Sequence, residues 1–496
     1  MIDFLKRDIP ILLLLLLFTA FGLGVVYWMN YELGMNPQLW KALRIFSIIF
    51  LALPLVIALR LLAYKGSIRL LILALTLMSI GYTIRYDIET KRDDFYYRKL
   101  AAGEVKSDDM RGPETLYSRV EPVGKAVIGY FALLAVFYFL RGRTDTLRIG
   151  IIFKPVLVLT LMIFHRLGSL VSGGRFIFGF TGWDIALPIL VITMADYLAD
   201  HYRSLGDWKK LSEFEPIYWV PLLILWLGPV AGFIIIGEFG VFVILGIYII
   251  LSLYLSTRRI VFVAASLAVI TLLGLIAVHY DLAPGHIGVR LSIWTDFYHN
   301  FPEKISPYEP LMNNEDFLDW LGNPNKRLQH LNGFLAIWHG GMTGAGLGLG
   351  YPIAIPVAVS DFIGVALAEN LGLAGLLTVT LIYILFTYHC FRLSMQMKAV
   401  GRFAVFTLQG IGLMILIQFI VSLAGPLSIL PMTGVPMPLV SRSYSALIAA
   451  LAAVGLAMVF EHQVALLPPP AEDHAPPVAI SKDKPLVIEL KEKGKK

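Results

Sequence analysis

The sequence predicts an all-α polytopic membrane protein, and three observations support this prediction. Of 496 residues, 57% are hydrophobic and only 15% are charged, whereas about a quarter of the residues in a soluble protein are charged. About twelve apolar runs approach the roughly 20 residues that a helix needs to cross a bilayer. Cationic residues gather in short segments between these runs, on alternate connections. The net charge of +6 therefore indicates membrane orientation rather than nucleic-acid binding.

The apolar runs give the order of the predicted transmembrane helices. We place them at 9–28, 45–64, 68–84, 126–140, 150–171, 184–199, 217–237, 239–257, 260–279, 362–388, 403–424 and 443–460. The first run follows Lys6 and Arg7 and lacks a small-residue cleavage site, so we expect an uncleaved helix rather than a signal peptide. Because basic connections face the cytoplasm and the number of spans is even, both termini are expected on the cytoplasmic side.

The segments between the spans divide the chain into regions. Residues 1–174 are expected to form N-terminal membrane helices with a charged outer loop at 85–125, and residues 175–279 to form central membrane helices. A large extracytoplasmic loop at 280–361 separates the ninth and tenth spans, and C-terminal membrane helices fill 362–462. The tail at 463–496 is rich in proline and lysine without an apolar period, which predicts a disordered cytoplasmic tail.

Two acidic residues near the tenth span are the first candidates for chemistry. Asp361 lies where the large loop enters an apolar run, and Glu369 follows eight residues later. Asp361, or Ser360 beside it, could cap the helix; alternatively, Asp361 could act as a base or hold a cation at the membrane boundary. Two helical turns put Glu369 on the same face as Asp361, about 12 Å deeper in the membrane. Because a carboxylate in a membrane is costly, we expect Glu369 to have a functional or network role.

Three other patterns bear on the site. Glu238 lies in a short GEFG connection and is either a turn residue facing water or a site residue. The glycines between 340 and 350 lack the GK[ST] of a nucleotide-binding loop, so they predict tight packing or backbone donors near a ligand. Histidines 286, 299, 330 and 339 lack the spacing of a zinc site, and the single cysteine, Cys390, excludes an intrachain disulfide.

The prolines before the last span mark a stiff, non-helical hairpin. Pro431, Pro436 and Pro438 lie between two apolar runs. Backbone groups without hydrogen-bond partners are not tolerated in lipid, so this hairpin must line protein or water.

The same segments carry a resemblance to a known family. Residues 431–441, PMTGVPMPLVS, resemble the PVTGVPLPFIS that begins the last motif of the SEDS family of RodA, FtsW and SpoVE proteins. The segment QHLNGFLAIWHGGMTGAGLG is similar to the family's YQxxQSLxAIGSGGLxGKGLG. Asp361 corresponds to the aspartate of the family's TDF motif, which is the proposed catalytic residue, and Glu369 to the first glutamate of GEELG. Glu238 corresponds to the aspartate of PDLG, and Arg290 to an arginine that opens the large outer loop.

The chain departs from the family pattern at several positions, which indicates a divergent member. The family's SYGGSS is Ser441-Arg442-Ser443-Tyr444-Ser445 here, so two glycines are absent and a cation is added. Val357 stands where the family has a glutamate. The family has a core of ten spans, so about twelve spans here imply two extra helices within the first 170 residues.

The resemblance implies a peptidoglycan glycosyltransferase that polymerises lipid II at the outer face of the cytoplasmic membrane, for cell shape or cell division. It implies an inverting reaction on a polyprenyl-diphosphate-linked donor, with Asp361 as the base. Residues implied to bind substrate or support the site are Glu369, Glu238, Arg290, Arg442, Ser441, Thr433 and Gly434. A divalent cation, Mg or Mn, could assist, and a class B penicillin-binding protein transpeptidase is the expected partner.

Three alternatives stay open beside this function. A flippase for lipid-linked precursors would need charged residues along a path through the membrane, whereas most acids here gather at the outer face. A polymerase or ligase of another polyprenyl-linked glycan is consistent with the altered SRSYS motif. A non-catalytic scaffold that only recruits the transpeptidase would not need Asp361 and Glu369.

Overall fold

The computed structural model describes residues 2–101, 116–148, 182–205, 207, 239–264, 266–268, 294, 324–352, 355 and 357–467. Throughout these residues the regular elements are helices. They are α1 (Ile2–Glu32), α2 (Leu39–Phe50), α3 (Ala52–Leu61), α4 (Arg69–Ala101), α5 (Leu116–Leu140), η2 (Thr144–Arg148), α7 (Gly182–Leu205), α10 (Phe239–Thr257), α14 (Pro324–Gly340), α15 (Ile363–Gln396), η5 (Met397–Ala399), α16 (Arg402–Ala424) and α17 (Tyr444–Leu466).

Within the described residues, 7 helical stretches are long and apolar enough to cross a membrane. They are Asp8–Glu32, Leu39–Leu61, Arg69–Phe95, Pro122–Leu140, Ile363–Gln396, Arg402–Ala424 and Tyr444–Leu466. Each overlaps one of the predicted runs, as expected for a multi-pass membrane protein. The predicted spans at 150–171 and 217–237 and most of 260–279 lie outside the described residues. The total of twelve spans therefore stays a prediction.

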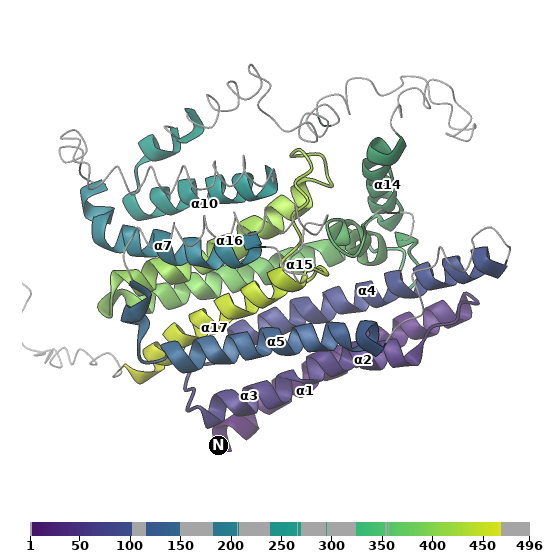
Figure 1. The fold of residues 1–496 in the computed structure, drawn as a ribbon, viewed down its shortest axis with the longest axis horizontal. Coiled ribbons are helices and arrows are strands. Elements are labelled where there is room, and N and C mark those ends of the chain that lie inside the picture. Colours follow the sequence, from purple (N-terminus) through teal and green to yellow (C-terminus); the bar gives the residue numbers. More distant parts are fainter. Residues whose placement is uncertain are drawn as a thin grey trace, which may run out of the picture.

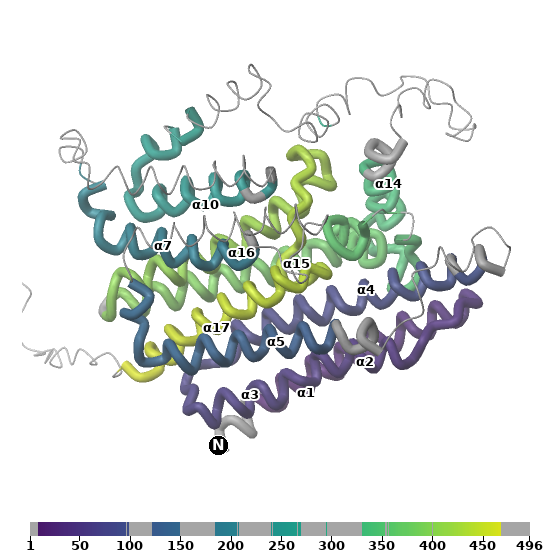
Figure 2. Tube along the Cα trace, viewed as in Figure 1, coloured from purple at the N-terminus to yellow at the C-terminus, as the bar shows by residue number. Residues whose placement is uncertain are grey.

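The long helices form a bundle in which elements distant in sequence pack side by side (Figure 1). α17 packs on α5, α16 lies between α15 and α7, and α1 packs along α4. In the same view, Figure 2 shows α1 to α3 on one side of the bundle and α10 and α14 on the other. Helix α14 runs across the direction of the long helices beside the start of α15 (Figure 1). It lies beside the end of the bundle where α15 begins, which we name the Asp361 end.

The prediction of a charged loop at 85–125 is wrong for a large part of that segment. Helix α4 continues through Ala101, and α5 begins at Leu116. The charges are accommodated because they pair within α4 and with α2: Asp87 with Lys91, Lys41 with Asp93, and Arg44 with Glu89. Since most of these side chains are buried or half-buried, this stretch is part of the packed protein rather than a solvated connection.

Helix α15 is broken near its start. Its 34 residues would extend about 51 Å if straight, more than one bilayer crossing requires. At Gly372 the backbone leaves the helical region, with φ 67° and ψ −172°. Asp361 and Glu369 both precede this break, and residues 363–371 form one continuous helical stretch, so the expectation that the two acids share a face stays a prediction.

Candidate active site

The segment before α15 and the proline-rich hairpin lie side by side. The backbone N–H of Arg442 donates to the carbonyl of Val359 at 2.9 Å. A Cβ added to Gly364 would lie 2.9 Å from Cε of Met437, so the start of α15 also contacts the hairpin. Asp361 is half-buried in the turn that these contacts hold. The fold thus brings the aspartate and the arginine-containing motif, about 80 residues apart in sequence, to one place.

Asp361 itself does not cap the helix. The N-cap residue of α15 is Phe362, and no side-chain hydrogen bond caps this helix. The preceding turn is closed by the backbone N–H groups of Ser360 and Phe362, which donate to the carbonyl of Val357 at 3.0 and 3.4 Å. Val357 has φ 51°, a conformation that is strained for a β-branched residue. Strain of this kind persists where the surrounding structure enforces it, often near functional residues.

The glycine-rich segment packs on the break in α15. The N–H groups of Ala345 and Gly346 donate to the carbonyls of Glu369 and Asn370 at 2.9 and 3.0 Å. A Cβ added to Gly344 would lie 2.3 Å from the carbonyl oxygen of Asn370. The glycines are therefore needed because two backbones meet here without room for side chains.

Glu369 lies beneath this glycine-rich segment and is only 3% exposed. Its Oε1 accepts the N–H of Tyr351 at 2.8 Å and lies 3.3 Å from Nδ1 of His339. Its Oε2 is buried without a hydrogen-bond partner. A buried carboxylate oxygen without a donor is unfavourable, so this oxygen is a candidate contact for a substrate group.

Cationic side chains gather beside the proline-rich hairpin. Nη1 of Arg442 lies 3.9 Å from Glu89 of α4, which also accepts from Arg44 of α2 at 3.3 Å. Close by, the Arg85 guanidinium lies over the ring of Tyr82, 3.7 Å from its centroid, and Lys125 of α5 lies 4.1 Å from the centroid of Tyr444.

Tyr82, Arg85 and Glu89 follow one another on α4 at spacings of three and four residues, Glu89 faces Arg442, and Tyr444 follows Arg442 by two residues, which places these groups in one cluster. Among the described residues of this cluster, cationic side chains outnumber the one carboxylate, Glu89, which suits an anionic ligand.

The other predicted hairpin residues, two of them buried and Gly434 half-buried, hold its shape. Thr433 and Ser441 are 2% and 6% exposed, and Gly434 has φ 67°. The N–H of Ser441 donates to the carbonyl of Met437 at 3.0 Å. A Cβ on Gly240 of α10 would lie 2.7 Å from the carbonyl oxygen of Thr433, so α10 supports the hairpin closely. The remaining predicted site residues, Glu238 and Arg290, lie outside the described residues.

An apolar cavity of about 220 Å³ opens between α5, α7, α16 and α17. Asp184 lies at one end of it and accepts hydrogen bonds from Ser443 at 3.4 Å and from Ser445. The other lining residues are almost all apolar, including several alanines of α17. The altered SRSYS motif thus lies next to the polar end of this apolar cavity.

Sequence reasoning missed the contribution of α1 and α4 to this site. Lys91 donates to the carbonyl of Gly350 in the glycine-rich segment and pairs with Asp87. Asp87 in turn accepts from Asn30 of α1 at 3.0 Å. The available signal was the acid–base spacing of four residues, Asp87 to Lys91, which is typical of a helix rather than a loop.

The described residues do not by themselves form a site for a divalent cation. Glu369 offers one unpaired oxygen, but no group of three His, Cys, Asp or Glu side chains that could hold a metal ion gathers in the part of the chain that the structure describes.

Comparison with known proteins identifies the family. A model of the FtsW, RodA and SpoVE family, described as cell cycle proteins, matches residues 102–465. The probable peptidoglycan glycosyltransferase FtsW of Enterococcus hirae is 34% identical over 135 residues, which cover 26% of this chain and 33% of that protein. The peptidoglycan glycosyltransferase RodA of Mycobacterium leprae is 28% identical over 229 residues, which cover 46% and 43%.

A third relative and one solved structure extend the comparison. The probable peptidoglycan glycosyltransferase FtsW of Aromatoleum aromaticum is 27% identical over 280 residues, which cover 54% of this chain and 59% of the relative. This chain thus spans less than two thirds of the length of these curated relatives. A chain from the structure of a peptidoglycan synthase complex matches with a TM-score of 0.50 and 15% identity, covering 80% of this chain and 98% of that one, which shows a shared fold. The chain belongs to the family of FtsW, RodA and SpoVE cell cycle proteins.

Proposed function

We propose that this protein is a peptidoglycan glycosyltransferase that polymerises lipid II at the outer face of the cytoplasmic membrane. The observation that carries the proposal is the contact between two motifs: the turn that holds Asp361 is hydrogen-bonded, through Val359, to Arg442. An acid is thereby placed near a cationic cluster at one end of a membrane bundle. The names of the relatives, which are peptidoglycan glycosyltransferases, support the same function.

The reaction needs a base and a site for an anionic leaving group. A sugar hydroxyl of one lipid-linked molecule attacks the anomeric carbon of another, and the bond from that carbon to the polyprenyl diphosphate breaks with inversion. Asp361 accepts the proton of the attacking hydroxyl. Arg442, with Arg85 and Lys125 in the same cluster, stabilises the negative charge on the departing diphosphate. Both roles call for the half-buried setting that the cluster provides, because charge interactions are stronger away from bulk water.

The apolar cavity beside Asp184 supports a lipid-linked substrate. A polyprenyl chain is apolar and needs a cavity or groove that opens towards lipid, whereas its diphosphate needs cations. The cavity between α5, α7, α16 and α17 and the cationic cluster both border the 441–445 motif. We further propose that both termini are cytoplasmic and that a single-span class B penicillin-binding protein is the partner.

The test is polymerisation of labelled lipid II by the purified protein, comparing wild type with Asp361→Asn. Loss of a general base lowers the rate by about 10²-fold to 10⁴-fold, with unchanged thermal unfolding. Asp200→Asn is the control, because Asp200 is half exposed and pairs with Arg148 far from this site.

Equal rates from Asp361→Asn and wild type would remove Asp361 from the mechanism. Wild-type protein that makes no polymer, alone or with its transpeptidase, would overturn the function. Activity on another polyprenyl-linked glycan but not on lipid II would favour the alternative that the SRSYS motif keeps open.

A further inference from the structure

One peptide unit lies between a buried ammonium and a buried carboxylate. The carbonyl of Gly350 accepts from Nζ of Lys91 at 2.5 Å, and the N–H of Tyr351, in the same peptide unit, donates to Oε1 of Glu369 at 2.8 Å. The positive charge thus meets the oxygen of the peptide, and the negative charge meets its N–H. Both charges polarise the peptide in the same sense, so each strengthens the hydrogen bond of the other.

The ammonium is supported by helices on the far side of this peptide. Lys91 is 3% exposed and pairs with Asp87, whose carboxylate is fully buried and also accepts from Asn30 of α1. A buried charge is tolerated only when it is paired and hydrogen-bonded, and Lys91 meets both conditions. The Lys91 side chain is therefore held in one buried position, and its ammonium does not extend towards water.

The peptide also packs directly on its acidic partner. A Cβ added to Gly350 would lie 3.2 Å from Cδ of Glu369 and 3.1 Å from Nδ2 of Asn370. The N–H of Gly348 donates to Oδ1 of Asn370 at 3.3 Å, which is a second hydrogen bond between residues 348–351 and α15. The orientation of Glu369 thus depends on where residues 348–351 lie, and that position depends in part on Lys91.

We propose that Lys91 is a positioning residue that sets the orientation of Glu369 through the Gly350–Tyr351 peptide. Because Oε1 of Glu369 is fixed by this peptide, the buried and unpaired Oε2 is held in one direction. Lys91 precedes residue 102, where the family match begins. The N-terminal helices would therefore take part in the site, and the catalytic consequence rests on the proposed function.

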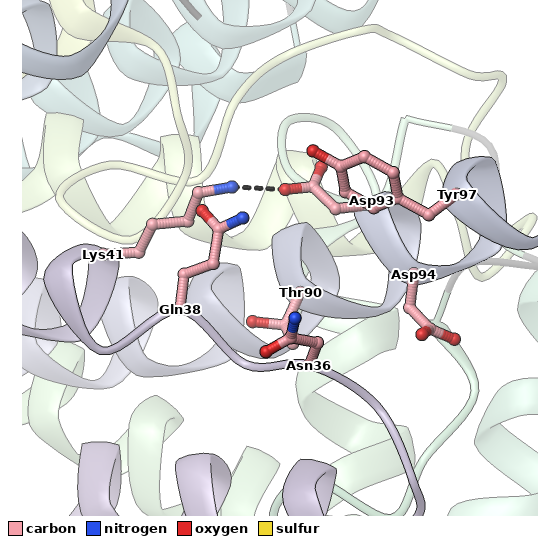
Figure 3. Close-up of a pocket in the computed structure, with 7 residues that line it drawn as sticks. All are labelled: Asn36, Gln38, Lys41, Thr90, Asp93, Asp94 and Tyr97. Carbon is pink, nitrogen blue, oxygen red and sulfur yellow. Dashed lines mark hydrogen bonds and ion pairs between the residues drawn. The ribbon is translucent and has the colours of Figure 1, made fainter.

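The chain offers a matched control for this proposal. Lys41 of α2 is also 3% exposed and pairs with Asp93 of α4. Figure 3 shows this pair in a pocket of about 250 Å³ whose other labelled residues come from α4 and from the segment before α2. Lys41→Met and Lys91→Met each remove one buried ammonium that pairs with an aspartate of α4. Of the two lysines, only Lys91 donates a hydrogen bond to Gly350.

The experiment measures the loop and the reaction separately on the full-length protein in detergent. Hydrogen–deuterium exchange of the 341–352 peptide is expected to become about tenfold faster in Lys91→Met and to stay unchanged in Lys41→Met. In lipid II polymerisation, Lys91→Met is expected to lower kcat about tenfold with KM within about twofold, and Lys91→Arg to recover most of the loss.

Unchanged exchange of this segment in Lys91→Met would overturn the proposal. Equally faster exchange in Lys41→Met would overturn it too, because it would indicate general loosening of the N-terminal helices. Equal losses of kcat in Lys91→Arg and Lys91→Met, without recovery, would also contradict it. If exchange responds as expected but wild-type protein makes no polymer, the positioning contact stands and the proposed function fails.

Discussion

Two buried glutamates at opposite ends of the bundle differ in how their oxygens are used. Glu461, near the end of α17, is 6% exposed and accepts from Tyr64 at 2.8 Å and from Ser67, while Nε2 of His389 lies 3.3 Å away. Glu369, near the start of α15, has partners on Oε1 only. The two residues are equally inaccessible, so burial alone does not distinguish them.

The difference separates a structural role from a functional one. Glu461 ties α17 to α15 and to the segment before α4, and all of its partners are present within the protein. Glu369 leaves an acceptor unsatisfied, which costs about 1–3 kcal/mol if nothing binds it. Natural structures keep such a group mainly where it acts on a ligand or stores strain. Positive φ does not separate the two ends, because Ala63, beside the Glu461 partner Tyr64, has φ 62° and Val357, near Asp361, has φ 51°.

Among the variants outside the acidic residues, the largest effect is expected from closing the space between the glycine-rich segment and α15. In Gly344→Ala, the new Cβ would lie 2.3 Å from the carbonyl oxygen of Asn370, and φ is 87°. Because the obstacle is backbone, the segment must move, and we expect a polymerisation rate about 100-fold lower. Gly24→Ala, where nothing lies within 4 Å of the new Cβ, is the control and should keep wild-type activity. Full activity of Gly344→Ala would show that this close packing is dispensable.

A smaller effect is expected from removing charge at the cationic cluster. Arg442→Gln should raise KM for lipid II about tenfold, because one cation facing the diphosphate is lost. Arg148→Gln removes an arginine at the other end of the bundle, where hydrogen bonding to Asp196 raises the pKa of Arg148. That variant should lower thermal stability without changing KM. A common KM for both variants and wild type would exclude Arg442 from substrate binding.

The smallest effect is expected at the strained turn before Asp361. Val357→Gly relieves a positive φ at a half-exposed position, so the free energy of unfolding should rise by up to about 1 kcal/mol. Thermal unfolding in detergent measures it, with Val400→Gly as an exposed control outside positive φ. If the strain also positions Asp361, the more stable variant will polymerise more slowly. Unchanged stability would show that the turn is not strained.

The sequence was sufficient for much of the fold and for part of the site. Apolar runs predict each helix that can span the membrane, because a bilayer imposes length and hydropathy directly. The motifs around Asp361 and Arg442 could be recognised, but their contact through Val359 depends on tertiary packing. Gly372 reads as one more residue of an apolar run, so the break in α15 was not foreseen.

The contribution of α1 and α4 to the site was harder to predict from the sequence. The many charges in α4 suggest a solvated loop, yet Asp87, Lys91 and Glu89 each have a partner on another element and stay in the helix. Which partner each charge meets is decided by long-range packing, which spacing along one helix does not specify. The pairing at four-residue intervals was the one local signal for the helix itself.

The most direct test compares the two glutamates by the same isosteric change, with polymerisation and thermal unfolding measured on each variant. Glu369→Gln should keep or raise thermal stability and lower kcat about 100-fold, because the group that meets the substrate is lost. Glu461→Gln should lower the free energy of unfolding by about 2 kcal/mol and leave the rate per folded molecule unchanged. The reverse pattern, a destabilised but active Glu369→Gln beside a stable but inactive Glu461→Gln, would contradict the assignment of chemistry to the Asp361 end.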